Sequence, residues 1–304
     1  MTDNHRETEQ EHRAGTVAIV GRPNTGKSTL LNRILGLKLS IVSKTAQTTR
    51  NRILGIHRTE KGEIAFLDTP GLHEPRGLLG EQMMREATQS AEDVDLLVWL
   101  IDPRVETKPH HRQSVLPLLV ATGRPIVMVM NKIDRVPRQQ LLPLMGAWGE
   151  AHSFTALIPI SAIHGDGIET LLNVVYENLP VGPPAYDEDT LTDRPERFLV
   201  AEIIREKVFR LTGQEIPHTT AVSIEHWEEE EGRVVIFAKI VVERDSQKGI
   251  VIGKGGSRIK AIGQKAREDI QRLLERRVHL ETRVVVDPSW PSRPERVLHL
   301  GYYQ

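Results

Sequence analysis

The segment from Gly21 to Ser28 reads G-R-P-N-T-G-K-S, which fits the pattern G-x-x-x-x-G-K-[ST]. An apolar run typical of a strand precedes it at residues 16–20, and a helical pattern follows at residues 30–35. A strand that leads through a glycine-rich loop into a helix turns backbone N–H groups toward one point, where the helix dipole also favours negative charge. The segment therefore predicts a site for a nucleoside phosphate, and the alternative is a flexible surface loop.

Each residue type in this loop has a chemical reason. Lys27 would reach the β- and γ-phosphates, and the Ser28 hydroxyl would ligate Mg²⁺. Gly21 and Gly26 permit backbone conformations that a side chain would obstruct. The predicted nucleotide contacts here are Gly21, Arg22, Pro23, Asn24, Thr25, Gly26, Lys27, Ser28 and Thr29.

A second polar segment, Asp68-Thr-Pro-Gly71, follows the apolar run at residues 63–67. Ligands of open α/β sheets bind at the carboxyl ends of the strands, so Asp68 can hold Mg²⁺ through water and the Gly71 N–H can touch a γ-phosphate. Loss of that phosphate would release the loop. The predicted nucleotide contacts in this segment are Asp68, Thr69, Pro70, Gly71 and Leu72.

Two further segments indicate which base is bound. Asn131-Lys-Ile-Asp134 follows the apolar run at residues 126–130. The Asp134 carboxylate can accept hydrogen bonds from the guanine N1–H and exocyclic amine, which adenine does not supply. After the next run, Ser161-Ala162 can offer a backbone N–H to the guanine O6. The predicted base-side contacts are Asn131, Lys132, Asp134, Ser161 and Ala162.

Taken singly, these short segments are weak signals that a structural turn would also explain. Their order behind the glycine-rich loop, each at a strand end, favours GTP. A P-loop ATPase or a small-molecule kinase is the rival interpretation, and Asp134 argues against it.

The elements that position these segments alternate along the first part of the chain. Apolar, strand-type runs are separated by helical patterns, which is typical of a doubly wound α/β sheet with buried parallel strands. A last helix is expected at residues 168–179, and the Pro-, Asp- and Thr-rich stretch at 180–196 reads as a linker. The runs lie at residues 16–20, 63–67, 95–101, 126–130 and 157–160.

Composition sets the outer bounds. The 304 residues favour two domains, and 39% hydrophobic with 27% charged residues describes an ordinary globular protein. The chain has no cysteine, which excludes a disulfide scaffold and a thiolate metal site. Residues 1–13 lack the apolar stretch of a signal peptide, and the strongest apolar run, residues 96–101, is too short to span a bilayer. We therefore expect a cytoplasmic protein.

Beyond the linker the pattern changes. A helix is expected at residues 198–211, with Gly213 after it, and strands at 219–227 and 234–243 around the acidic turn 228–232. A segment from Ile250 to Ile259, a helix to about Arg276 and a strand at 278–286 follow. Residues 244–277 hold ten Lys or Arg against four acids, although the net charge of the chain is −1. Such a basic stretch suits a polyanionic partner, and a solvated helix face is the alternative.

The sequence resembles the bacterial Era family of translation-factor-type GTPases. The glycine-rich loop, Ala46-Gln-Thr-Thr-Arg50, Asp68-Thr-Pro-Gly-Leu72, Asn131-Lys-Ile-Asp134 and Glu202-Ile-Ile-Arg-Glu-Lys207 all look like that family's segments. The similarity runs from about Val17 to Tyr302. Two residues depart from the family pattern: Thr25, where Val is usual, and Ile163, where Lys or Glu is common. We expect them to alter nucleotide exchange more than nucleotide identity.

By this resemblance, Thr48 and Thr49 belong to the first switch, where a Thr hydroxyl joins Mg²⁺ only when the γ-phosphate is present. Thr49 is the favoured ligand, and a strand edge or loop is the structural alternative. The resemblance makes Lys27, Thr49 and Gly71 the catalytic residues and Ser28, Thr49 and Asp68 the magnesium site. Leu72 stands where Ras-like enzymes carry the glutamine that orients water.

With no glutamine there, hydrolysis must depend on another group, and we expect a slow intrinsic rate. Similar GTPases suggest a potassium ion, with Asn24 supplying an oxygen ligand. A cation near the β–γ bridge would offset developing charge. Asn24 as a turn-capping residue is the alternative.

The second part of the chain resembles a type II KH domain, with Gly253-Lys-Gly-Gly256 between the last two helices. Glycines let the backbone approach a single strand closely, apolar neighbours form a floor for bases, and the basic side chains supply phosphate charge. Ile250 and Ile252 could equally be plain core. The predicted RNA-binding residues are Ile250, Ile252, Gly253, Lys254, Gly255, Gly256, Arg258 and Lys260.

The expected fold class is thus α/β, a doubly wound P-loop GTPase domain followed by a smaller α+β type II KH domain. The expected division is a disordered tail at 1–14, the GTPase domain at 15–182, a linker at 183–197, the KH domain at 198–287 and a C-terminal tail at 288–304. The resemblance implies a monomeric GTP-driven switch in small ribosomal subunit assembly that recognises the 3′ end of small-subunit ribosomal RNA. A GTP-dependent scaffold without RNA binding, or one in peripheral contact with the inner face of the cell membrane, is the alternative.

Overall fold

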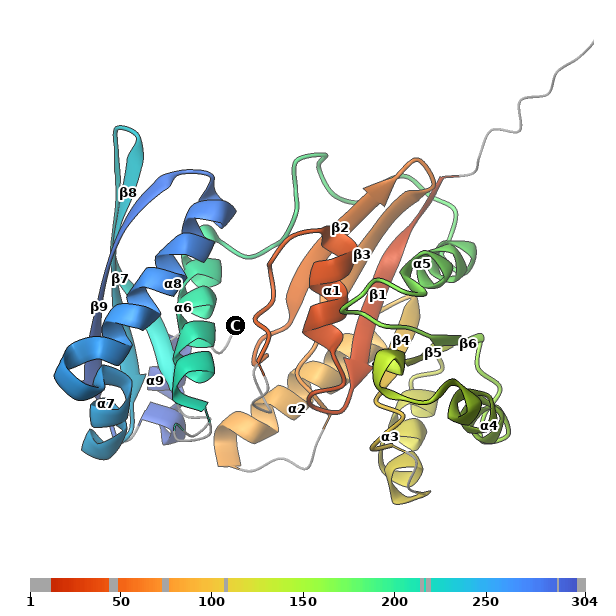
Figure 1. Ribbon diagram of the computed structural model, residues 1–304. Helices are drawn as coiled ribbons and strands as arrows, with labels where there is room; N and C mark the ends of the chain where they lie inside the picture. Colours follow the sequence, from red (N-terminus) through yellow and green to blue (C-terminus); the bar gives the residue numbers. More distant parts are fainter. Residues whose placement is uncertain are drawn as a thin grey trace, which may run out of the picture.

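The computed structural model describes residues 12–43, 49–72, 77–106, 109–213, 216, 220–288 and 290–299. Two domains lie side by side, one around a six-stranded sheet and one around a three-stranded sheet (Figure 1). Residues 1–11 of the expected tail and Thr48 lie outside the described residues. In the part of the chain that is described, none of the helices has the length and apolar character needed to cross a bilayer.

The first domain has its six strands in the order β2-β3-β1-β4-β5-β6. All neighbouring pairs are parallel except β2 and β3. The strands are β1 (Arg13–Gly21), β2 (Ile53–Thr59), β3 (Gly62–Asp68), β4 (Leu96–Ile101), β5 (Ile126–Met130) and β6 (Ala156–Pro159). The helices are α1 (Lys27–Leu35), α2 (Gly77–Glu92), α3 (Pro109–Ala121), the 3₁₀ turn η1 (Ile133–Arg135), α4 (Arg138–Gly149) and α5 (Ile168–Glu177).

Both faces of this sheet are covered, as a doubly wound fold requires. Val17 and Ile19 belong to one apolar cluster with residues of α1 and α5, whereas Ala18 and Val20 belong to a second cluster with residues of α2, α3 and α4. Alternate residues of a strand point to opposite faces, so β1 is buried from both sides. The predicted fold class is confirmed.

The sequence interpretation missed β2, which is antiparallel to β3 at the edge of the sheet. Its residues do not form a continuous apolar run, because His57 and Arg58 interrupt it. The segment predicted as a linker runs beside β2. The Ile56 N–H donates to the Leu191 carbonyl at 3.0 Å, and the Arg194 guanidinium donates to the Arg52 carbonyl.

The second domain follows the order helix, strand, strand, helix, helix, strand. Helices α6 and α8 pack on one face of the sheet β7-β8-β9, in which β7 and β8 are antiparallel and β8 and β9 parallel. The elements are α6 (Glu196–Thr212), β7 (Ala221–Glu230), β8 (Arg233–Val242), α7 (Asp245–Ile252), η3 (Lys254–Gly256), α8 (Ser257–Leu274) and β9 (Arg277–Val286). This is the predicted KH arrangement, with the glycine loop between α7 and α8.

Some boundaries differ from the expected ones. Strand β1 begins at Arg13 and α6 begins at Glu196, two residues earlier than the expected domain limits in each case. The acidic turn is shorter than predicted, because β7 continues to Glu230. The chain reverses at Gly232, which has a φ of 75°. The far end of the β7–β8 hairpin extends beyond the helices, so its charged residues stay in water (Figure 1).

The prediction of a tail after residue 287 is wrong for residues 290–299. These residues form the 3₁₀ turn η4 (Trp290–Ser292) and the helix α9 (Pro294–His299). Trp290 is fully buried and clusters with Val297, Ala221 and Val241. Removing so large an apolar side chain from water holds the segment on the second domain.

Candidate functional site

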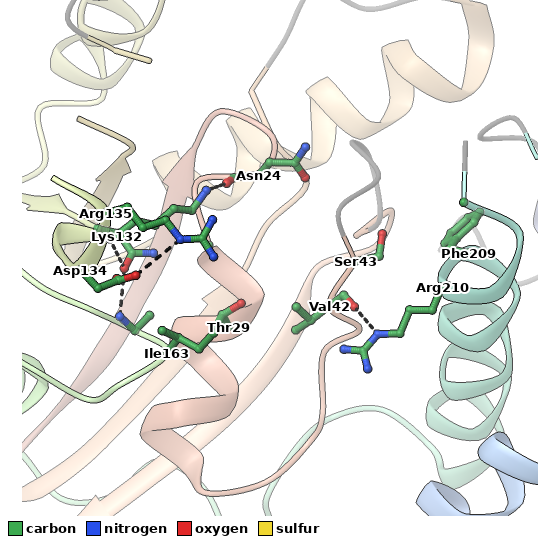
Figure 2. Close-up of a pocket in the computed structure, with 14 residues that line it drawn as sticks. Asn24, Thr29, Val42, Ser43, Lys132, Asp134, Arg135, Ile163, Phe209 and Arg210 are labelled. Carbon is green, nitrogen blue, oxygen red and sulfur yellow. Dashed lines mark hydrogen bonds and ion pairs between the residues drawn. The ribbon is translucent and has the colours of Figure 1, made fainter. Parts of the chain in front are cut away.

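The predicted nucleotide segments meet at the carboxyl ends of the central strands. An open cleft of about 810 Å³ lies there, and a smaller pocket of about 60 Å³ adjoins it over the glycine-rich loop. Figure 2 shows the larger cleft, with Lys132 and Asp134 on one wall and Phe209 and Arg210 of α6 on the other. The cleft is therefore formed by both domains.

The glycine-rich loop adopts a conformation that needs its glycines. Gly21 and Gly26 have φ of 148° and 103°, and a Cβ on Gly26 would lie 2.2 Å from the Asn131 side-chain amide. The buried Lys27 Nζ donates to the carbonyls of Gly21 and Arg22, both at 3.1 Å. Burial lowers the pKa of Lys27 to about 8. A buried cation at the N-terminus of a helix suits a phosphate anion.

The three predicted magnesium ligands come together beside Lys27. The Ser28 hydroxyl lies 2.9 Å from the Thr49 hydroxyl and donates to Asp68 Oδ2 at 2.7 Å. Asp68 is fully buried, and among the described residues its Oδ1 has no hydrogen-bond partner. Burial raises the pKa of Asp68, while the Lys27 charge opposes that shift. Two hydroxyls and an under-coordinated buried carboxylate are the hard oxygen donors that Mg²⁺ prefers, so these residues fit the ion.

The residues after Asp68 pack against the glycine-rich loop. A Cβ on Gly71 would lie 2.7 Å from the Pro23 nitrogen, so the two loops are in close backbone contact. The Thr69 hydroxyl donates to the Ile19 carbonyl, and Leu72 is buried in the core below the sheet. Thr69 and Leu72 were predicted as nucleotide contacts, but their side chains are engaged elsewhere, and the Leu72 N–H donates to the Gly21 carbonyl at 2.9 Å.

The base-side residues form one hydrogen-bonded group. The Ser161 hydroxyl donates to Asp134 Oδ1 at 2.8 Å, and the Asn131 amide donates to the Thr25 carbonyl at 2.7 Å. Burial would raise the pKa of Asp134, but the hydrogen bond from Ser161 holds it below its ordinary value. The Ala162 N–H, predicted to meet the guanine O6, here donates to Asn131 Oδ1 at 3.0 Å. Asp134 is thus held as an ionised acceptor at the cleft.

Two carboxylates at the end of β4 were missed in the sequence. Asp102 accepts from Lys132 Nζ at 3.0 Å and from Arg104, and Lys132 also donates to the Asn24 carbonyl. Burial would raise the pKa of Asp102, but hydrogen bonds from Arg104 and Lys132 bring it to about 2. Glu106 is buried behind it. The signal that could have found Asp102 is its position directly after a buried strand.

The predicted RNA-binding residues gather at one loop of the second domain. Gly253, Gly255 and Gly256 all have positive φ, and a Cβ on Gly255 or Gly256 would meet no atom within 4 Å. Lys254 and Lys260 are exposed there, as phosphate contacts require.

Three other residues of the predicted RNA set have structural contacts. Arg258 donates to the Ile250 carbonyl at 2.5 Å, which ties α7 to α8. Ile250 and Ile252 are half-buried against the core, which fits the core role left open for them, and their role as a floor for bases stays a prediction.

Comparison with known proteins agrees with this geometry. Residues 16–132 match a family described as 50S ribosome-binding GTPase, and residues 215–290 match the KH domain. GTPase Era of Geobacter sp. strain M21 is 48% identical over 97% of this chain and 99% of its own length. GTPase Era of Leuconostoc citreum strain KM20 is 44% identical over 97% of this chain and 98% of its own.

Two solved structures share the whole architecture. Era of Aquifex aeolicus bound to GDP and aluminium fluoride superimposes with a TM-score of 0.92 at 41% identity. Era in complex with MgGDPNP and nucleotides 1506–1542 of 16S ribosomal RNA gives a TM-score of 0.93 at 40% identity. Both comparisons cover 96% of this chain and all of the other chain. Sequence and fold agree from end to end, and the chain belongs to the Era family of GTPases.

Proposed function

We propose that this chain binds and hydrolyses GTP with magnesium and uses that cycle to bind and release the 3′ end of small-subunit ribosomal RNA during assembly of the small subunit. The observation that carries the proposal is that buried Lys27 and the Ser28–Thr49–Asp68 oxygen cluster lie at the smaller pocket, which adjoins the cleft lined by ionised Asp134. The Era protein crystallised with MgGDPNP and 16S ribosomal RNA shares this fold, which supports the RNA target.

Each side chain has a separate task at the nucleotide. Lys27 would exchange its carbonyl partners for the β- and γ-phosphates, and Asp134 would accept from the guanine N1–H and amine. Ser28 and Thr49 would hold Mg²⁺ directly and Asp68 through water, with the bound ion neutralising charge on the phosphates. The Gly71 N–H would meet the γ-phosphate. Because the oxygen cluster already lies together, little reorganisation is needed when the ion binds.

Hydrolysis in this chain lacks a side chain that could orient water at position 72, because Leu72 is in the core. We therefore propose a slow intrinsic rate that potassium raises. Asn24 supports this role, since it is exposed at the cleft in a left-handed conformation, with φ 64°, and Lys132 holds its carbonyl. A cation bound by the Asn24 side chain would offset charge at the β–γ bridge.

The cytoplasmic location, the monomeric state and a peripheral membrane contact stay predictions.

The link between nucleotide and RNA would pass through the residues that precede the first switch. The Val42 carbonyl accepts from Arg210 Nε at 3.2 Å, and the Val42 N–H donates to Glu206 Oε2 at 3.4 Å (Figure 2 shows the Arg210 bond). Lys38 of the first domain donates to Glu206 and to Asp269 of α8. A γ-phosphate that orders the switch would then bias how α6 and α8 pack, and RNA would in turn tighten GTP binding.

The experiment that tests the proposal separates the two activities. Gly255→Asp with Gly256→Asp places negative charge in open space at the RNA loop, so RNA crosslinking should fall to background while GTP turnover without RNA is unchanged. Lys27→Ala should abolish GTP binding. In wild type, cognate RNA should raise GTP affinity or turnover. RNA crosslinking that survives the double substitution, or GTP binding that survives Lys27→Ala, would contradict the proposal.

A further inference from the structure

A tryptophan of the C-terminal segment contacts the nucleotide domain. The Arg50 Cζ atom lies 5.7 Å from the centroid of the Trp290 ring, above its face. Both residues are buried, with exposed fractions of 3% and 0%. Trp290 lies 240 residues after Arg50 in the sequence, so this contact joins the C-terminal segment to the residue that directly follows the switch residue Thr49.

The Trp290 ring beside Arg50 is packed against elements of both domains. Trp290 packs with Val297 on Ala221 of β7 and Val241 of β8, which places it in the second domain. The 3₁₀ turn that carries it, η4, also lies against α2 of the first domain. The ring is therefore fixed between the domains, in contact with both.

Arg50 is the direct neighbour of the magnesium ligand. Thr49, only 7% exposed, precedes it and lies 2.9 Å from the Ser28 hydroxyl. Adjacent Cα atoms are about 3.8 Å apart across a rigid peptide, so a displacement of Arg50 moves Thr49. The hydroxyl has to be placed to within a fraction of an ångström to ligate Mg²⁺.

We propose that Trp290 is a positioning residue for Thr49, acting through Arg50, and that it favours the GTP-bound state over the GDP-bound state. The proposal rests on the proposed function, in which Thr49 joins Mg²⁺ only when the γ-phosphate is present. A guanidinium over an indole ring is attracted most strongly when both are out of water, as they are here. The Trp290 ring therefore stabilises the GTP-bound state, in which Thr49 is held at Mg²⁺, and leaves the affinity for GDP unaffected.

The test compares affinities for GDPNP and GDP in the full chain with Mg²⁺. Trp290→Leu keeps an apolar side chain but removes the ring. It should weaken GDPNP binding about 30-fold, which corresponds to the ~2 kcal/mol of a desolvated cation–π contact, with GDP affinity unchanged within about twofold. Trp290→Phe, which keeps a ring, should restore most of the loss. Trp227→Leu is the matched control. The Trp227 ring centroid lies 5.9 Å from the Cζ atom of Arg197 in the same domain, so this substitution should change the affinity for neither nucleotide.

A second arm leaves the C-terminal packing intact. Arg50→Gln should reproduce the GDPNP-specific loss, and adding Trp290→Leu to it should produce no further change. Equal losses for GDPNP and GDP in Trp290→Leu, or wild-type GDPNP affinity in Arg50→Gln, would overturn the proposal. If Trp290→Leu unfolds, the Arg50→Gln result alone decides. Absence of GDPNP and GDP binding in wild type would instead refute the proposed function.

Discussion

Glu106 makes a prediction about stability and pH, because it is a carboxyl group buried next to the phosphate site. It is 1% exposed, and its Oε1 accepts the Asp102 N–H at 3.4 Å. Its Oε2 has no hydrogen-bond partner among the described residues. Burial raises the pKa of Glu106 from 4.5 to about 7, against the lowering effect of that N–H and of the Arg22 and Lys27 charges.

The raised pKa of Glu106 determines both the sign and the size of the change in folding stability with pH. The folded protein holds the proton more tightly than the unfolded chain, so Glu106 lowers stability progressively as pH rises from the unfolded pKa to the folded one. Integrated between pH 5 and pH 8, the loss is about 2.5 kcal/mol. Glu106→Gln cannot ionise and lacks this loss.

The assay is urea unfolding of wild type and Glu106→Gln, without nucleotide, at several pH values. Titrating groups that do not interact with Glu106 cancel in the difference, as does the constant cost of burying the new amide. The stability of the variant relative to wild type should rise by about 2.5 kcal/mol from pH 5 to pH 8. Parallel pH profiles for the two proteins would refute the reasoning.

Three further predictions concern the nucleotide and the domain interface. Asp134→Asn removes two charge-assisted hydrogen bonds to guanine and should weaken GTP binding by at least about 100-fold in calorimetry, with a gain for xanthosine nucleotides; unchanged GTP affinity would exclude the assigned base contact. Asn24→Ala should abolish any excess of the GTPase rate in potassium over sodium buffer, and equal rates in wild type would refute the cation role. Lys38→Ala removes a partly exposed ion pair to Glu206 while Lys207 still holds Asp269. It should therefore reduce the ratio of RNA affinities with GDPNP and GDP by about fivefold, or ~1 kcal/mol; an unchanged ratio would show that this pair does not couple the domains.

The architecture could be predicted because local sequence patterns determine it. The buried parallel strands are continuous apolar runs, and the loops that bind ligand lie at their carboxyl ends by the geometry of the fold. Strand β2 was not predicted because it is an edge strand with polar positions. Its Gly55 is explained only by the packing of α1 against the strand. A Cβ there would lie 2.5 Å from Leu35.

The contacts between the domains could not be predicted from sequence. Val42 and Glu206 are 164 residues apart, and Lys38 and Asp269 are 231 apart. Charged residues at such separations have no periodicity that would pair them, and each alone resembles a solvated surface group. The buried Trp290 had a local signal, a tryptophan within a stretch otherwise read as tail, but its partner Arg50 could be identified only in the folded molecule.

The positions of these contacts bear on how the two activities communicate. Val42 lies before the first switch and Arg50 lies after it, and each contacts the second domain, one through Glu206 and Arg210 and the other through Trp290. A change in the switch would therefore act on the second domain at two separated points, on α6 and on the C-terminal segment. Two points of contact resist rotation as well as separation, so the nucleotide state would set the orientation of the RNA-binding domain as well as its proximity.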